Sequence, residues 1–217
     1  MQKATNCTKA VEMIPDGATL MIGGFLGVGT PHRTIEELIR QGKKNLTIIA
    51  NDTGRPALGI GKLVVAKLVK KAIVSHIGTN PETQKQMIAG ELEVVLTPQG
   101  TLAEQIRAGG FGLGGVLTAT GIGTTVAEGK QTIEVNGKLY LVELPLRADF
   151  ALLAAHRSDY RGNLEYALTA RNFNSVMAMS ADHVIVEPDH IVPVGVIPPD
   201  AVATPFCCVD YIIERCN

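Results

Sequence analysis

Short apolar runs alternate with segments of helical periodicity along the first half of this chain, and this alternation constrains the fold more than any other feature. A continuous apolar run predicts a buried strand at 18–25, and further strands are predicted at 45–52, 71–78 and 91–98. Apolar spacing and stop signals predict helices at 32–42, 62–70, 81–91 and 100–110. Because strands separated by helices of about ten residues form βαβ units, we expect them to run parallel in one sheet.

The second half of the chain has a different pattern. Residues 131–144 alternate around Asn136-Gly137, which is the strongest short signal for a β-hairpin. Further strands are expected at 150–159, 183–188 and 209–214, with a helix near 172–181. We therefore predict an α/β fold, with a mostly parallel sheet flanked by helices and a small antiparallel hairpin insertion. Residues 1–217 are expected to form a single domain.

The charge balance argues against nucleic-acid and membrane partners. The chain has 20 basic and 21 acidic residues, so it has no basic excess for phosphates or anionic lipids. Lys67, Lys70 and Lys71 form a short basic cluster that a solvated helix face explains. The sequence has no run of about 18 apolar residues and no signal-peptide pattern at its N-terminus. We expect a cytoplasmic protein that binds neither nucleic acid nor membrane.

The cysteine and histidine positions do not predict a metal site. Cys7, Cys207, Cys208 and Cys216 include no pair with Cys-x-x-Cys spacing. The histidines share no ligand spacing either, so we expect no metal and reduced thiols. His76 lies near the end of a predicted strand, where a structural histidine is the simpler interpretation.

Four glycines, Gly23, Gly24, Gly27 and Gly29, fall in the turn after the first predicted strand. In open parallel sheets, ligands bind beyond the carboxyl ends of the strands, and glycines there expose N–H donors. A tight turn without a ligand explains these glycines as well, and both interpretations stay open on the glycines alone. The Gly-x-Gly-x-x-Gly pattern at 110–115 follows a predicted helix instead of a strand, so it does not predict a dinucleotide site.

The segment Asp16–Pro31 meets every fixed position of a known signature: Asp/Asn-Gly-x-x, three apolar residues, Gly-Gly-Phe, three residues and Gly-x-Pro. Further matching segments lie at 51–53, 75–80, 97–104 and 170–174. Over essentially its whole length the chain resembles the α subunits of the two-component coenzyme A transferases, the acetate/acetoacetate and 3-oxoacid transferase family.

The resemblance implies a ping-pong exchange between a short-chain acyl-CoA and a carboxylic acid. In the family a glutamate attacks the acyl-CoA and transiently carries coenzyme A as a thioester, before a second carboxylate takes it. That glutamate belongs to the β subunit, within a Ser-Glu-Asn-Gly motif that this chain lacks. Glu134 precedes Asn136-Gly137 with one residue too many and is more simply a solvated strand residue. The implied partner is a β subunit in an α2β2 assembly, with coenzyme A as a substrate and no other cofactor.

The resemblance also implies which residues line the substrate and coenzyme A site. Gln99 faces the reacting carboxyl group in the family, and its amide can support an oxyanion, while no catalytic residue is expected in this chain. Asn51 is the implied contact to the carboxylate substrate. The other implied lining residues belong to the glycine loop and the end of the third strand: Gly23, Gly24, Phe25, Gly27, Gly29, Gly78 and Asn80.

Several roles stay open at this stage. Asp52 is unfavourable beside a carboxylate substrate unless it is paired or turned away. The segment 171–174 fits either a subunit boundary or a buried hydrogen-bond network. The alternative to a transferase subunit is a non-catalytic ligand-binding module, because the same fold serves sugar-phosphate isomerases and effector sensors. The preferred acyl group is not readable, since a methylene changes binding by only about 1–3 kcal/mol.

Overall fold

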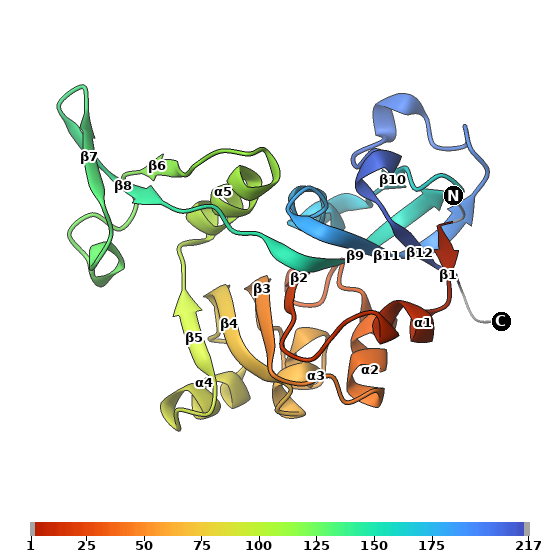
Figure 1. Ribbon diagram of the computed structural model, residues 1–217, viewed down its shortest axis with the longest axis horizontal. Helices are drawn as coiled ribbons and strands as arrows, with labels where there is room; N and C mark the ends of the chain where they lie inside the picture. The colour runs from red at the N-terminus through yellow and green to blue at the C-terminus, as the bar shows by residue number, and fades with distance from the viewer. Residues whose placement is uncertain (1–2, 215–217) are drawn as a thin grey trace.

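The computed structural model describes residues 3–214, which form a nine-stranded sheet and a separate three-stranded sheet (Figure 1). The large sheet has the order β1-β12-β11-β9-β2-β3-β4-β5, with β10 paired to β9. All its neighbouring strands are parallel except β10 and β9, so the prediction of a mostly parallel sheet is confirmed. The bounds are β1 Ala4–Thr5, β2 Thr19–Ile22, β3 Leu46–Asp52, β4 Val69–His76, β5 Glu93–Leu96, β9 Ala148–Asp159, β10 Leu164–Glu165, β11 Ala181–Val192 and β12 Tyr211–Ile213.

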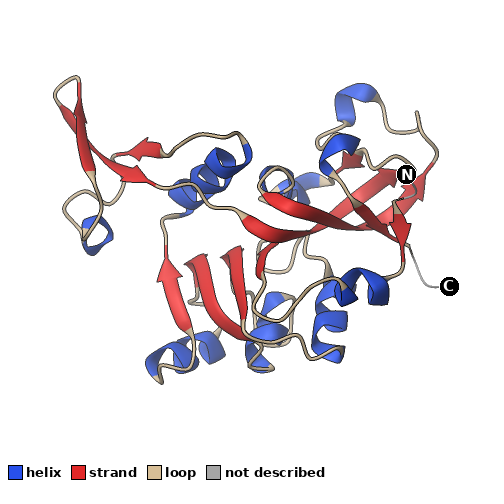
Figure 2. Cartoon of the chain, in the orientation of Figure 1, coloured by secondary structure: helices blue, strands red, loops and turns tan. Residues whose placement is uncertain are grey.

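Helices pack on both faces of the large sheet (Figure 2). Side chains of α1 to α4 join one apolar cluster with the sheet, and side chains of α5 and α6 join a second cluster. The bounds are α1 Cys7–Glu12, α2 His32–Arg40, α3 Ile60–Val65, α4 Pro81–Ile88, α5 Gln99–Gly110 and α6 Asn174–Met177. Short 3-10 helices are η1 Thr125–Ala127, η2 Leu168–Arg171, η3 Pro199–Ala201 and η4 Phe206–Cys208.

The two clusters divide the side chains of the central strands by alternation. On β2, Leu20 and Ile22 belong to the cluster of α1 to α4, and Met21 belongs to the cluster of α5 and α6. On β3, Ile48 and Ile49 are divided in the same way. Because successive side chains of a strand point to opposite faces, a sheet covered on both faces needs continuously apolar strands. This is why the sequence shows apolar runs instead of an apolar–polar alternation.

The order of the strands reverses beside β2. From β2 the chain adds β3, β4 and β5 in one direction, and later it places β9 on the other side of β2. Ligands of open parallel sheets bind at such a reversal, outside the carboxyl ends of the strands. The glycine loop follows β2 at this position, and its Gly23 N–H donates to the Leu152 carbonyl of β9 over 3.0 Å. The fold therefore places the loop at the edge where a ligand is expected.

The three-stranded sheet forms an arm that projects from the main body (Figure 1). Its antiparallel strands lie in the order β6 (Val116–Thr118), β8 (Lys138–Glu143) and β7 (Thr132–Val135). Asn136 and Gly137 have φ values of 51° and 73°, as a two-residue hairpin turn requires, so the predicted hairpin is confirmed. The sequence did not predict β6, because its three residues lie between glycine- and threonine-rich turns.

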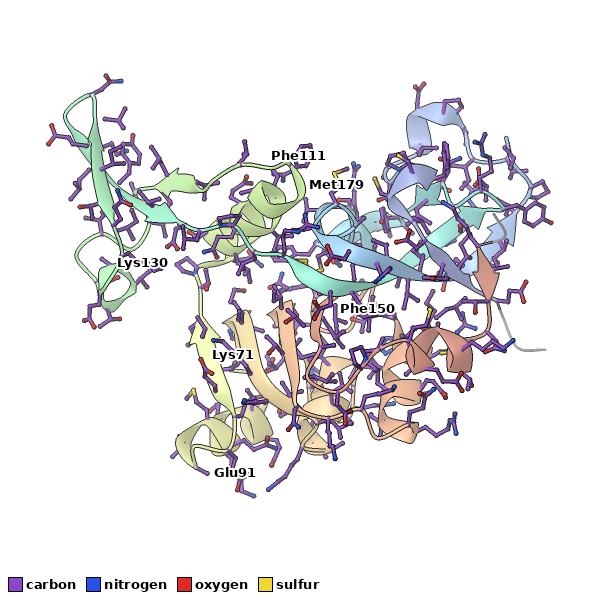
Figure 3. The ribbon with its side chains drawn as sticks, viewed as in Figure 1. Lys71, Glu91, Phe111, Lys130, Phe150 and Met179 are labelled. Carbon is purple, nitrogen blue, oxygen red and sulfur yellow. The ribbon has the colours of Figure 1, made fainter. Side chains whose placement is uncertain are left out.

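A buried carboxylate fastens the arm to the main body. Lys130 Nζ lies 2.6 Å from Glu143 Oε1, and Figure 3 shows Lys130 on the arm. Gln105 Nε2 of α5 donates to Glu143 Oε2 over 3.1 Å. Glu143 is only 2% exposed, so the two bonds replace the water that its charge would otherwise keep. Glu143 therefore links the arm both to its own loop and to α5.

One predicted helix is displaced. The helix expected at 62–70 is α3, which ends at Val65. Lys67 then takes a left-handed φ of 55°, and the chain turns directly into β4. Lys70 and Lys71 therefore lie on a strand, and the expectation that the basic cluster occupies one solvated helix face was wrong.

Two elements near the N-terminus were missed, and one helix later in the chain is shorter than predicted. The sequence did not predict β1, which pairs in parallel with β12, or α1, which is capped by the Asn6 side chain accepting from Lys9 N–H over 2.8 Å. The helix expected near 172–181 is reduced to the four residues of α6, because the chain enters β11 at Ala181.

Candidate functional site

The glycine loop begins where β2 ends and closes on itself in a tight turn. Phe25 and Val28 exchange two backbone hydrogen bonds of 3.0 and 2.9 Å. Leu26 and Gly27 between them have φ values of 48° and 92°, the left-handed region that a type I′ turn requires at both central positions. The turn leaves the Phe25 side chain 42% exposed.

The first two glycines of the loop lie directly against other parts of this chain. A Cβ at Gly23 would lie 1.8 Å from Asn174 Oδ1, and a Cβ at Gly24 would lie 1.9 Å from Thr30 Oγ1. Both distances are far shorter than a carbon–oxygen contact allows. Close packing within the chain therefore already requires glycine at these two positions.

Several N–H groups of the loop are engaged within the chain. Gly24 N–H donates to Asn172 Oδ1 over 3.1 Å, and Leu26 N–H donates to Asp52 Oδ2 over 3.1 Å. These donors, together with those used inside the turn, do not point to a ligand in this conformation. Support for an oxyanion at this site therefore falls mainly to side chains.

Asp52 holds the loop and is turned away from the surface. Its Oδ1 accepts from Gly54 N–H over 2.7 Å, while its Oδ2 accepts from Leu26. The residue is 3% exposed. The Asp52 carboxylate is thus paired with backbone N–H donors. This explains why an acidic residue next to Asn51 need not repel a carboxylate substrate.

Asn51 and Gln99 come together from β3 and the first turn of α5. Gln99 Nε2 donates to Asn51 Oδ1 over 3.1 Å. Ser75 Oγ of β4 lies 2.8 Å from the Asn51 carbonyl oxygen and 3.1 Å from Asn51 Oδ1, and its hydroxyl donates there. Because these bonds occupy Asn51 Oδ1, the Nδ2 hydrogens of Asn51 and one Nε2 hydrogen of Gln99 remain for a ligand.

An open hollow of about 400 Å³ lies against this pair. It is lined by Phe25, Asn51, Gln99, Thr169, Asn172 and Phe173. Aromatic rings and amides form its walls, and no lining side chain is ionisable. A hollow of this character suits an acyl group bearing a carboxylate or a thioester. It provides hydrogen-bond donors, but its lining contains no carboxylate or thiol to act as a nucleophile and no general base to activate the Thr169 hydroxyl.

Some of the implied site residues lie elsewhere. Gly27 and Gly29 line a separate hollow of about 180 Å³ together with His32 and His156. Asn80 is fully buried and caps α4, with its side-chain oxygen accepting from the first N–H groups of the helix. Its side-chain nitrogen also donates to the Thr53 carbonyl over 2.9 Å, so both ends of the amide are engaged within the chain.

The remaining implied residues are divided between surface and interior. Gly78 is exposed, and a Cβ there would lie 2.8 Å from the His76 ring. Gly23 and Gly24 are buried behind the turn. The structure therefore brings Phe25, Asn51 and Gln99 together at the hollow. Gly23, Gly24 and Gly78 do not line it.

Two asparagines fasten the glycine loop from the segment before β11. Asn172 Nδ2 donates to the Val28 carbonyl over 3.0 Å. Asn174 Nδ2 donates to the Gly29 carbonyl over 2.9 Å, and its Oδ1 accepts from Ala154 N–H over 3.2 Å. Asn174 is fully buried. The structure thus shows a hydrogen-bond network in this segment, buried at Asn174, while Arg171 is exposed.

Thr169, Asn172 and Phe173 line the hollow but were not identified from the sequence. Asn172 and Phe173 belong to the matching segment 170–174, for which no ligand contact was expected, and Thr169 lies just before that segment. Asn172 meets Gly24 across 148 positions of the chain. Contacts at that separation leave no local pattern in a single sequence.

The groups with displaced pKa values lie outside the hollow. Burial raises the pKa of Tyr166 to about 12. The hydrogen bond from Arg40 lowers the pKa of Glu37 to about 2. Displaced pKa values can mark catalytic groups, but these two belong to structural contacts.

The described residues contain no group of three or more His, Cys, Asp or Glu side chains that could hold a metal ion, and Cys216 lies outside them. Glu134 is an exposed residue of β7 on the arm.

None of the helices in the described part of the chain has both the length and the apolar character that crossing a bilayer demands.

The sequence and the fold of this chain both match a known class of enzyme subunits. The family model described as coenzyme A transferase matches residues 4–215, and the chain belongs to this family. It is 58% identical over 204 residues to the acetate CoA-transferase subunit alpha of Escherichia coli (strain K12), covering 94% of this chain and 93% of the relative. It is 52% identical over 200 residues to the acetoacetyl-CoA:acetate/butyrate CoA transferase alpha subunit of Clostridium acetobutylicum, covering 92% of each.

A solved structure with the same fold is an acyl-CoA transferase from Escherichia coli O157:H7 in a thioester complex with coenzyme A. The TM-score is 0.87 at 24% identity, covering 98% of this chain and 47% of that chain. This chain therefore spans about half the length of that transferase. The expected transferase-like fold is confirmed, and the relatives give no support to the alternative of a non-catalytic ligand-binding module.

Proposed function

We propose that this chain is the α subunit of a two-component coenzyme A transferase, which moves coenzyme A between a short-chain acyl-CoA and an acid such as acetate, butyrate or acetoacetate. The observation that carries the proposal is the open hollow with amide and aromatic walls and no ionisable side chain. Such a site binds and polarises an acyl group but does not attack it. Identities of 58% and 52% to transferase α subunits support the same assignment.

The exchange needs a carboxylate from a β subunit. Attack of that glutamate on the thioester carbonyl gives a tetrahedral anion, which expels the coenzyme A thiolate and leaves a mixed anhydride. The thiolate then attacks the glutamyl carbonyl and releases the first carboxylate, so coenzyme A is held as a glutamyl thioester. A second carboxylate reverses these steps and leaves as the new acyl-CoA. No proton or electron is gained or lost overall.

Gln99 and Asn51 supply hydrogen-bond donors to the anionic species of this sequence. Their mutual bond of 3.1 Å holds both amides in place before a substrate arrives. Loss of a preorganised donor at an oxyanion raises the barrier by about 3 kcal/mol, which corresponds to a rate loss of about 100-fold or more. The rings of Phe25 and Phe173 form an apolar wall beside these amides.

The experiment that tests the function compares the chain alone with the chain co-purified with its β chain, with acetoacetyl-CoA formation as the readout. We expect activity only from the pair, and robust activity from the chain alone would refute the proposal. In the pair, Gln99→Ala is expected to lower kcat about 100-fold. The matched control is Gln131→Ala, an exposed glutamine on the arm, which should leave kcat unchanged.

Finer features of the enzyme follow from the same proposal. We expect two copies of each subunit, which sedimentation of the co-purified complex measures. We expect a cytoplasmic location, which cell fractionation measures. Coenzyme A enters as a substrate, and activity is expected to survive dialysis against a chelator because no metal is required.

A further inference from the structure

Leu168 stands out from the surface beside the hollow. Its side chain is 95% exposed, and its φ is 49°, in the left-handed region that leucine rarely adopts. This backbone conformation is unfavourable for a residue with a Cβ, and full exposure of the side chain forgoes the gain from burying it. Strained positions of this kind persist where the surroundings impose them, often at functional surfaces.

Hydrogen bonds hold the backbone next to Leu168. Asn172 Nδ2 donates to the Thr169 carbonyl and to the Val28 carbonyl, each over 3.0 Å. The residue after Leu168 is thereby tied to the glycine loop. The leucine is therefore presented from a fixed position at the mouth of the hollow, which Thr169 lines.

Other exposed apolar side chains lie on or beside the glycine loop, which Asn172 ties to the residue after Leu168. Phe25, Val28 and Leu58 are 42%, 49% and 37% exposed. Phe25 and Val28 pair across the turn, and Leu58 reaches the same turn, since a Cβ at Gly27 would lie 2.4 Å from Leu58 Cδ2. We call Phe25, Val28, Leu58 and Leu168 the apolar rim.

We propose that the apolar rim is the surface on which the β subunit docks to complete the active site. This inference rests on the proposed function. The hollow has no carboxylate among its lining residues, so the chain that supplies the carboxylate has to approach this mouth. An aliphatic side chain presented on an ordered support is suited to fill an apolar pocket of that chain, as interface anchors do. Docking here also excludes water from the hollow.

The charges beside the rim indicate the character of the partner surface. Arg55 lies in the loop between β3 and α3, where it pairs with Leu58, and Arg171 ends η2; both side chains are exposed. Charges around an interface steer association and select partners of opposite sign. The inferred partner surface is an apolar pocket for Leu168 bordered by carboxylates.

The test is a titration of immobilised cognate β chain with variants of this chain. Leu168→Asn removes the apolar side chain and suits the left-handed backbone, where asparagine is enriched. We expect its affinity for the β chain to fall about 30-fold or more, while the thermal midpoint of the isolated variant stays equal or rises. Leu168→Met keeps an apolar side chain and should bind within about fivefold of wild type. Ile88→Asn, at an 82% exposed position on α4, is the control and should bind normally.

The possible results separate the two proposals. A wild-type chain that does not bind the β chain overturns the proposed function. A wild-type chain that binds, with Leu168→Asn binding equally well, overturns the docking surface alone. If Leu168→Asn raises the KM for acyl-CoA but leaves the affinity for the β chain unchanged, Leu168 is a substrate contact, and the docking surface is again overturned. Self-association of the isolated chain that Leu168→Asn abolishes would assign the rim to a second copy instead.

Discussion

Replacing Gly23 with alanine tests whether the glycine loop is held by internal packing. The added Cβ would lie 1.8 Å from Asn174 Oδ1 and 2.5 Å from Asn174 Cγ. Gly23 is not among the glycines with left-handed φ, so alanine meets no backbone penalty and the effect comes from this contact. The Asn174 side chain therefore has to move.

Asn174 cannot move without losing hydrogen bonds. Its side chain accepts from Ala154 N–H and donates to the carbonyls of Gly29 and Ala170 at 2.9 and 2.8 Å. The residue is fully buried, so water does not replace these partners. A buried polar group left unpaired costs about 1–3 kcal/mol, and the loss of two bonds predicts a destabilisation of about 4 kcal/mol. For a chain of this size, the thermal midpoint should fall by about 8–16 °C.

The assay is thermal and urea unfolding of the isolated chain, with Gly100→Ala as the matched control. A Cβ at Gly100 meets no atom within 4 Å, and the residue is in the first turn of α5. Alanine there should be neutral or stabilise the chain by up to about 1 kcal/mol. A midpoint for Gly23→Ala within about 2 °C of wild type would refute the packing argument. If that variant also lost acyl-CoA transfer with the β chain, Gly23 would have to face the ligand.

Two further predictions concern charged contacts away from the hollow. Lys130→Met leaves the buried carboxylate of Glu143 with Gln105 as its only partner. We expect the free energy of unfolding in urea to fall by about 3 kcal/mol. The double variant Lys130→Met with Glu143→Leu should largely restore it. The pKa of Glu37 is lowered to about 2 by the hydrogen bond from Arg40, so this contact stabilises the fold above the ordinary carboxyl pKa and is lost as the pH falls towards 2. Arg40→Ala should therefore lower the urea midpoint at pH 7 more than at pH 2; an equal loss at both pH values would contradict this assignment.

Much of the central sheet was predictable because its signals are local. Continuous apolar runs identify strands buried on both faces, and Asn136-Gly137 identifies a turn through its left-handed φ values. The helix boundary at Val65 was misplaced because the sequence 62–70 stays apolar and basic through the turn at Lys67. Apolar periodicity does not distinguish the end of a helix from the start of the next strand when both are buried.

The candidate site was predictable only in part, and for a different reason. Asn51 lies at the end of one strand and Gln99 follows another, so the rule for parallel sheets and the resemblance both place them at one edge. Asn172 and Phe173 reach the same hollow from a segment that lies far along the chain. Their position depends on β9 returning beside β2, which is a property of the whole topology.

The glycine signature acquires a different meaning from this geometry. Because Gly23 and Gly24 have no side chains, Asn174 and Thr30 can pack against the loop. Hydrogen bonds to the side chains of Asp52 and Asn172 hold the loop in place. A signature of glycines near a ligand site does not by itself place the glycines in contact with the ligand. Here the glycines permit packing that holds the turn, and the turn presents Phe25.

A rigid wall of this kind is consistent with a nucleophile that comes from another chain. Donors at an oxyanion are effective when they do not reorganise during the reaction. The mutual bond of Gln99 and Asn51 and the fixed turn at Phe25 satisfy that condition within one chain. The attacking carboxylate, in contrast, is converted to a thioester in the first half-reaction and regenerated in the second, and it needs free access to the acyl group. Placing it on a separate chain that seats against the apolar rim lets the wall stay fixed, and it makes subunit docking a condition for catalysis.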